Sequence, residues 1–277
     1  MGMRISTNMS SIQAQRTLVK SQDAIQKSMA QISSGSRIVK AADDAAGLGI
    51  SEMLKSQIRS YGQASRNAND GVSMVQVAEG GLSEISNILT RMRELAIQAS
   101  SDTVGDTERG YINKEVQQLK DESERISRTN KFGKTSLLDG TSNDFDIQVG
   151  VNNDKFEDRI SFKASELNAT TASLGIDGVD FSTKEGAQEL LMVVDSAQER
   201  VNGFRANIGA IQNRLESAVE NLGVQHENLS AANSRIRDAD IAASSSEAAR
   251  NQVLLQASTA TLAQANQQPQ LALKLIS

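Results

Sequence analysis

The stretch LLMVVDSAQERVNGFRANIGAIQNRLESAVENL, residues 190–222, decides the fold class. Its apolar residues recur at alternating intervals of three and four, which is the spacing of a coiled-coil seam. The pattern predicts one long helix that packs against a partner helix along its length. The seam positions are Leu190, Val194, Ala197, Val201, Phe204, Ile208, Ile211, Leu215, Ala218 and Leu222.

The same spacing occurs in three other places. It runs through residues 61–99 and, more briefly, through residues 112–126, with many Ala and Gly positions that favour close helix approach. Asp106 or Thr107 is the expected N-cap of the second of these helices, because either side chain can accept an orphan backbone N–H. A weaker seam near the N-terminus stops at SSGSR, where Gly35 can end a helix. That weaker seam uses Leu18, Ile25, Met29 and Ile32.

Composition supports long helices with thin cores. The 277 residues include one Pro, and aromatic residues make up only 3% of the chain. Because Pro breaks helical hydrogen bonding, its near absence favours helix. Few aromatics and many Ala, Ser and Gln residues predict bundles or coiled coils rather than a large globular core.

Only one part of the sequence predicts strands. Phe145, Ile147 and Val149 alternate with polar residues, and Ile160 and Phe162 do so after a turn-rich link. This pattern predicts a small β-hairpin at about residues 143–165. We interpret the acidic residues of its link, Asp154, Glu157 and Asp158, as a solvated loop. The predicted fold class is therefore mainly α, a long antiparallel helical coiled-coil bundle with a small β-hairpin.

The two ends of the chain differ in kind from its middle. Residues 251–273 carry no charge but hold six Gln and two Asn, which is too many amides for a membrane-spanning helix. We expect residues 1–44 and 237–277 to form a terminal coiled coil, and residues 45–236 to form a rod-like helical domain that contains the hairpin. Two such thin helices bury little by themselves. We expect them to become ordered when many copies pack their ends together.

No motif of an enzyme is present. The single histidine, His226, begins HENLS, and the second His of a zinc-binding HExxH motif is replaced by Ser230. There is no Cys, no phosphate-binding loop and no G-x-S-x-G motif. We expect no enzyme activity, no cofactor and no metal. The net charge of −5 argues against nucleic acid as a partner, and the lack of a long apolar run argues against a membrane.

Several motifs resemble those of bacterial flagellins. At the N-terminal side these are ISTNMSSIQAQRTL, ISSGSRIVKAADDAAGLGISEML at 32–54 and NANDGVSMVQVAEGGLSEISNILTRMRELAIQAS at 67–100. At the C-terminal side they are RIRDADIA at 235–242 and VLLQASTATLAQANQQPQLALKLI at 253–276. The motifs occur in the family's order and cover nearly the whole chain, so the resemblance is specific.

The resemblance implies a structural subunit that self-assembles into the flagellar filament, outside the cell, for motility. It implies that the terminal helices form the inner core of the filament. The residues expected to pack there are Leu18, Ile25, Met29, Ile32, Val253, Leu254 and Leu262. Long flagellins carry outer domains between the hairpin and the returning helix. Here only residues about 177–185 occupy that place, so we expect no outer variable domains and a thin filament.

The resemblance also implies partners and a route of secretion. Flagellins are exported unfolded through the flagellar type III apparatus without a cleaved signal, and the first 22 residues lack the apolar core of such a signal. The implied partners are other copies of the chain, a flagellar export chaperone, the filament cap and the hook-junction proteins. A vertebrate Toll-like flagellin receptor is a further candidate. Its contacts in the family match Arg91, Leu95 and Glu115, although Arg91 and Glu115 also fit ordinary helix-surface charges.

Other classes of protein stay open on the residues alone. A hook–filament junction protein would share the same termini, but the RELAIQ run and the short middle favour flagellin itself. A signalling coiled coil, such as the cytoplasmic part of a receptor, fits the seams but not the hairpin or the missing membrane span. An enzyme would require a flagellin with an inserted protease, and no insertion with a complete HExxH motif is present.

Overall fold

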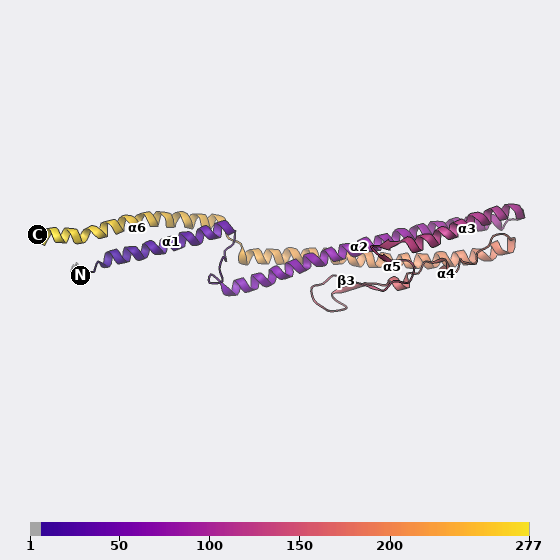
Figure 1. The fold of residues 1–277 in the computed structure, drawn as a ribbon, viewed down its shortest axis with the longest axis horizontal. Helices are drawn as coiled ribbons and strands as arrows, with labels where there is room; N and C mark the ends of the chain where they lie inside the picture. Colours follow the sequence, from indigo (N-terminus) through magenta and orange to yellow (C-terminus); the bar gives the residue numbers. More distant parts are fainter. Residues whose placement is uncertain (1–6, 277) are drawn as a thin grey trace. The chain divides into compact units, whose positions relative to one another are not determined.

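The computed structural model describes the backbone of residues 7–276 and the side chains of residues 7–267. The described part is mainly helical, with two small antiparallel sheets, so the predicted fold class is confirmed (Figure 1). The helices are α1 (Met9–Ser34), α2 (Ala45–Ala99), α3 (Asp106–Thr129), the 3₁₀ helix η1 (Ala164–Glu166), α4 (Thr171–Leu174), α5 (Lys184–Arg237) and α6 (Ile241–Ile276). The strands are β1 (Lys131–Phe132), β2 (Thr135–Ser136), β3 (Phe145–Gln148) and β4 (Arg159–Phe162).

The chain forms two compact units. The terminal unit comprises Met1–Ile58 and Asn228–Ser277, and the central unit comprises Arg59–Glu227. The long helices α2 and α5 each contribute to both units. The predicted domains, with bounds at residues 44 and 237, refer to layers of a filament, and they stay a prediction.

In the central unit, α2 and α5 run antiparallel. Three cross-helix pairs show this, because the α5 partner falls in number as the α2 residue rises. Arg205 donates to Glu79 at 2.9 Å, Gln198 to Ser86 at 2.6 Å, and Arg93 to Asp195 at 2.6 Å. Along the two helices lies the core that the heptad spacing predicts. Its fully buried seam residues include Val75, Leu82, Ile85, Leu89 and Met92 of α2 and Val194, Val201, Ile208 and Leu215 of α5.

The turn between α2 and α3 is closed by a buried arginine. Arg109 is 7% exposed, and its guanidinium donates to the carbonyl oxygens of Ala99 at 2.9 Å and Ser101 at 3.0 Å. It therefore satisfies carbonyls that the end of α2 leaves without helical partners. The predicted N-cap at Asp106 or Thr107 is wrong, because Gly105 caps α3 without a side-chain hydrogen bond. The Asp106 carboxylate instead accepts from Arg109 at 2.7 Å.

The segment between α3 and α5 covers one side of the helices. The predicted hairpin is present as β3 and β4, with Phe145 opposite Phe162 and Gln148 opposite Arg159. A second hairpin, β1–β2, was not predicted, because each of its strands has only two residues. Buried side chains attach the segment to the core: Leu137, Leu138, Phe162, Leu167, Leu174, Ile176, Val179 and Phe181.

Gly71 lets the hairpin lie close against α2. A Cβ atom at this position would stand 2.7 Å from Cδ1 of Ile147 and 3.3 Å from its Cγ2. The Asn67 amide also donates to the Gln148 carbonyl at 3.2 Å. The close contact at Gly71 and the hydrogen bond to the β3 backbone thus add to the buried side chains that attach the hairpin to the helices.

Candidate assembly surface

The two terminal helices α1 and α6 pack along a seam in which small residues alternate with Leu and Ile. The seam positions follow the three–four spacing on both helices, and each is at least half-buried. Its most buried side chains are all serines, namely Ser21, Ser28 and Ser258. The α1 positions are Ser11, Ala14, Leu18, Ser21, Ile25, Ser28 and Ile32, and the α6 positions are Ser244, Ala248, Asn251, Leu255, Ser258, Leu262 and Ala265.

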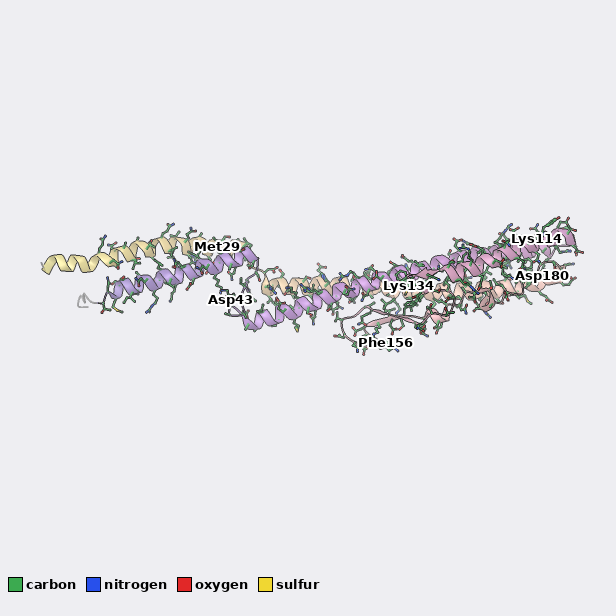
Figure 2. All side chains as sticks on the ribbon, in the orientation of Figure 1. Met29, Asp43, Lys114, Lys134, Phe156 and Asp180 are labelled. Atoms are coloured by element: carbon green, nitrogen blue, oxygen red, sulfur yellow. The ribbon has the colours of Figure 1, made fainter. Side chains whose placement is uncertain are left out.

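The residues predicted to pack in a terminal core fall into two groups. Leu18, Ile25, Ile32 and Leu262 lie half-buried on the seam. Met29, Val253 and Leu254 lie off it. Their exposed fractions are 59%, 65% and 46%, and Figure 2 labels Met29 on α1. Met29 was placed on the α1 seam from the sequence, and this is wrong, since Ser28 occupies that position.

These exposed residues belong to a larger apolar set. Large apolar side chains project from both terminal helices away from the seam, with exposed fractions of 42% or more. Because burial of apolar area is the main favourable term in association, such a set favours contact with further protein. The other members are Met9, Ile12 and Val19 on α1 and Ile241 on α6.

At the end of the α1–α6 pair where α1 begins, the Asn8 side chain accepts one hydrogen bond and donates another. Its side-chain oxygen caps α1 by accepting from the Ser11 N–H at 3.1 Å. Its amide nitrogen donates to the Ala265 carbonyl at 2.8 Å. Pro269, four residues beyond Ala265, has no N–H to give that carbonyl a helical partner. Asn8 therefore supplies the hydrogen bond that the proline removes.

At the other end of the pair, where α1 ends and α6 begins, the turn between α1 and α2 closes the structure. Gly35 ends α1 in the left-handed conformation, with φ of 66°, as predicted. Its carbonyl accepts from Ala239 N–H at 2.9 Å, and Ser36 forms an antiparallel bridge with Asp238. Lys27 lies 3.0 Å from the Asp43 carboxylate, and this hydrogen bond is the main reason that the pKa of Asp43 is lowered.

The candidate receptor residues lie on α2 and α3 of the central unit. Arg91 donates to Glu115 at 2.9 Å and to Glu94 at 3.0 Å. These two carboxylates, Glu94 first, raise the pKa of the Arg91 guanidinium. All three side chains are about half exposed, so the pairs contribute little to stability. Leu95 is only 2% exposed and belongs to the core of the central unit.

The described residues offer little for other chemistry. Within residues 7–267, no group of three or more His, Cys, Asp or Glu side chains is placed to hold a metal ion. No helix in the described part of the chain is both long and apolar enough to cross a membrane. His226 is exposed on α5.

Two family models match most of the chain. The model for the bacterial flagellin N-terminal helical region matches residues 5–143, and the model for the C-terminal helical region matches residues 191–276. The chain belongs to the bacterial flagellin family. The flagellins are structural proteins and not enzymes, and they form the extracellular filament of the flagellum.

Individual flagellins are similar over their whole length. A flagellin of Halalkalibacterium halodurans is 42% identical over 274 residues, which is 99% of this chain and 100% of the relative. One of Bacillus subtilis is 39% identical over 303 residues, with the same coverage. The crystal structure of Bacillus cereus flagellin is 33% identical, with a TM-score of 0.51 over 61% of this chain and 94% of that one. The chain is therefore a structural subunit of the flagellar filament.

The serines of the terminal seam were missed in the sequence. A search for apolar periodicity does not register Ser21, Ser28 or Ser258, although they hold the same heptad positions that Leu or Ile hold elsewhere. The signal that would have found them is the regular spacing of small residues between Leu18, Ile25 and Ile32. Such small positions let two flagellin terminal helices approach closely without burying much apolar area.

Proposed function

We propose that the terminal helices form the inner core of the filament and drive its polymerisation. One observation carries this proposal. The buried side chains of the α1–α6 seam are serines, while Met29, Val253 and Leu254 are exposed. A large part of the apolar area of the pair is thus directed away from its own seam, where neighbouring subunits can cover it.

The energetic consequence is a coupling between order and assembly. Fixing the backbone of a residue costs about 1–2 kcal/mol of conformational entropy, which a seam with serines at its most buried positions and only half-buried Leu and Ile side chains offsets poorly. Contacts between subunits must supply the difference. A copy that adds to an existing end meets several neighbours at once, so assembly is expected to be nucleated and to favour preformed ends. The central unit has a continuous core of its own and needs no such help.

Polymerisation on seeds tests the role of the C-terminal helix. The full chain, incubated with sheared filament seeds, is expected to give long thin filaments in negative-stain electron microscopy. A version without residues 237–277 is expected to give none under the same conditions, because it lacks half of the proposed core. Filaments from the truncated version would contradict the proposal. If neither version polymerises and both stay helical, the ends require another partner, as in a junction protein.

The same proposal includes three further partners, namely the export chaperone, the filament cap and the hook-junction proteins. It also includes export without a cleaved signal. The support is family membership together with a chain that has no Cys and no membrane-spanning helix among its described residues. Mass spectrometry of filaments collected outside the cell checks the export route. The N-terminal segment is expected to be intact, and loss of that segment would contradict the proposal.

Recognition by a Toll-like flagellin receptor is proposed for the surface around Arg91 and Glu115. The paired side chains are exposed on the central unit, while Leu95 is buried in its core. Arg91→Glu is expected to lower activation of a receptor reporter cell by the monomer. Unchanged activation by a folded Arg91→Glu monomer would contradict the proposal that this surface is the receptor contact.

A further inference from the structure

The loop between β3 and β4 presents an exposed aromatic side chain. Phe156 is 91% exposed, more than any other large hydrophobic residue in the described part of the chain, and Figure 2 shows it at the edge of the molecule. The side chain contributes nothing to the core of its own chain. Its neighbour Lys155 forms no ion pair with any residue in 7–267.

The loop that carries Phe156 is held in place from within. Asp158, expected to be solvated, is 6% exposed, and its carboxylate accepts from the backbone N–H groups of Asn152 at 3.2 Å and Asp154 at 2.9 Å. The Asp154 carboxylate in turn accepts from Phe156 N–H at 2.7 Å and Glu157 N–H at 2.9 Å. The backbone of such a fixed loop loses little freedom on binding, so the loop is preorganised to present Phe156 to a partner.

An apolar hollow lies elsewhere on the same unit. It has a volume of about 370 Å³ and is formed by α2, β1 and β3. Met74, Phe132, Phe145 and Ile147 supply its apolar lining, and Asp70 and Asp146 stand at it as exposed acids. We call this hollow the socket. Aromatic rings and a thioether sulfur are favourable contacts for an inserted phenyl ring.

Charge also matches between the loop and the socket. Lys155 precedes Phe156 directly, and neither Asp70 nor Asp146 is in an ion pair with a described residue. A larger hollow of about 650 Å³ lies beside the loop, but Arg214 and the loop's own Glu157 line it. Arg214 would repel an incoming Lys155, so the smaller socket is the better match.

We propose that Phe156 and Lys155 of one copy dock into the socket of a neighbouring copy in the filament. Phe156 packs against Phe132, Phe145 and Met74, and Lys155 pairs with Asp70 or Asp146. The docking residues and the socket are different parts of the surface. After one contact has formed, the copy that inserts its loop still has a free socket, and the other copy still has a free loop. Heterologous contacts of this kind propagate into open polymers. The inference rests on polymerisation of the chain and adds a contact outside the terminal helices.

Removal of the phenyl ring tests the contact in the full chain. Phe156→Ala is expected to raise the critical concentration for seeded polymerisation by about tenfold, as truncation of a central interface residue does. Phe156→Leu keeps an apolar side chain and is expected to stay within about threefold of the parent chain. The thermal unfolding of both monomers is expected to be unchanged, since the side chain is exposed. An unchanged critical concentration for Phe156→Ala would overturn the inference.

Cross-linking tests the location of the contact independently. The parent chain has no Cys, so single cysteines can be placed without background. A Lys155→Cys chain copolymerised with an Asp70→Cys chain and treated with a short bismaleimide is expected to give covalent dimers in filaments only. A Lys155→Cys chain with a Lys114→Cys chain, whose α3 position lies outside the socket, is expected to give none.

Filaments from the first pair without dimers would overturn the socket contact. They would leave the terminal-core proposal intact, because the chains would still have polymerised. Failure of the full chain to polymerise at all would instead contradict the proposal for the terminal helices.

Discussion

Leu254→Asp is expected to abolish filament formation while the central unit stays folded. Leu254 is 46% exposed on α6, so in the single chain an aspartate there remains hydrated and costs little. In the proposed core, the same carboxylate would be buried among apolar side chains without a cationic partner. The effective penalty for burying an ion is several kcal/mol. Because each 1.4 kcal/mol is about a factor of ten, the critical concentration should rise by more than about a hundredfold.

Two comparisons make the result specific. Leu254→Met conserves volume and apolar character, so it is expected to polymerise almost like the parent chain. Circular dichroism of the Leu254→Asp monomer should retain the thermal transition of the central unit. Sedimentation and electron microscopy measure filament formation. Normal filaments from Leu254→Asp would contradict the proposal that α6 lies in the filament core.

Ile208→Asp is expected to unfold the central unit. Ile208 is 1% exposed on α5 and belongs to the continuous core shared with α2. Loss of the side chain alone costs about 2–5 kcal/mol, and an unpaired carboxylate in its place adds a large desolvation penalty. The sum is comparable to the whole free energy of unfolding of a typical domain, about 5–15 kcal/mol. Circular dichroism should show a large loss of helical signal at room temperature.

A substitution on the opposite face provides the control. Met192 lies on the same helix but is 72% exposed, so Met192→Asp is expected to leave the helical signal and the unfolding temperature nearly unchanged. If Ile208→Asp kept full helicity, the assignment of the α5 seam to the core would be refuted.

The central unit was predictable because large apolar residues occupy its seams. Val194, Ile208 and Leu215 recur at heptad spacing, and each is fully buried in the structure. A pattern of this strength reflects the main energy that holds the helices together. The β3–β4 hairpin was predictable for the same reason, since Ile160 and Phe162 alternate with polar residues and point into the core.

The terminal unit was harder to predict because its energetics differ. The hydrophobic signal at Met29 favoured the wrong seam position, while the neighbouring Ser28 lies on the true seam. Sequence periodicity also does not say which copy covers an apolar side chain. Val253 and Leu254 were expected to be packed, but nothing in a single chain packs them.

Local hydrogen bonding accounts for the remaining differences. Asp106 or Thr107 was expected to cap α3, but Gly105 does so, and the Asp106 carboxylate accepts from Arg109 instead. Asp158 was expected to be solvated, but it organises the loop that carries Phe156. In both cases a charged side chain binds a nearby group that its motif does not indicate, three residues away for Asp106 and four to six residues away for Asp158. Apolar periodicity carries no information about such local pairs.

Amide hydrogen exchange of the monomer and the filament tests the central claim most directly. The claim is that the terminal helices gain their stability from neighbouring copies. Amides of residues 9–34 and 241–267 are expected to exchange rapidly in the monomer and slowly in the filament. Those of residues 75–99 and 194–215 should be protected in both. Strong protection of the terminal helices already in the monomer, or none in the filament, would contradict the account.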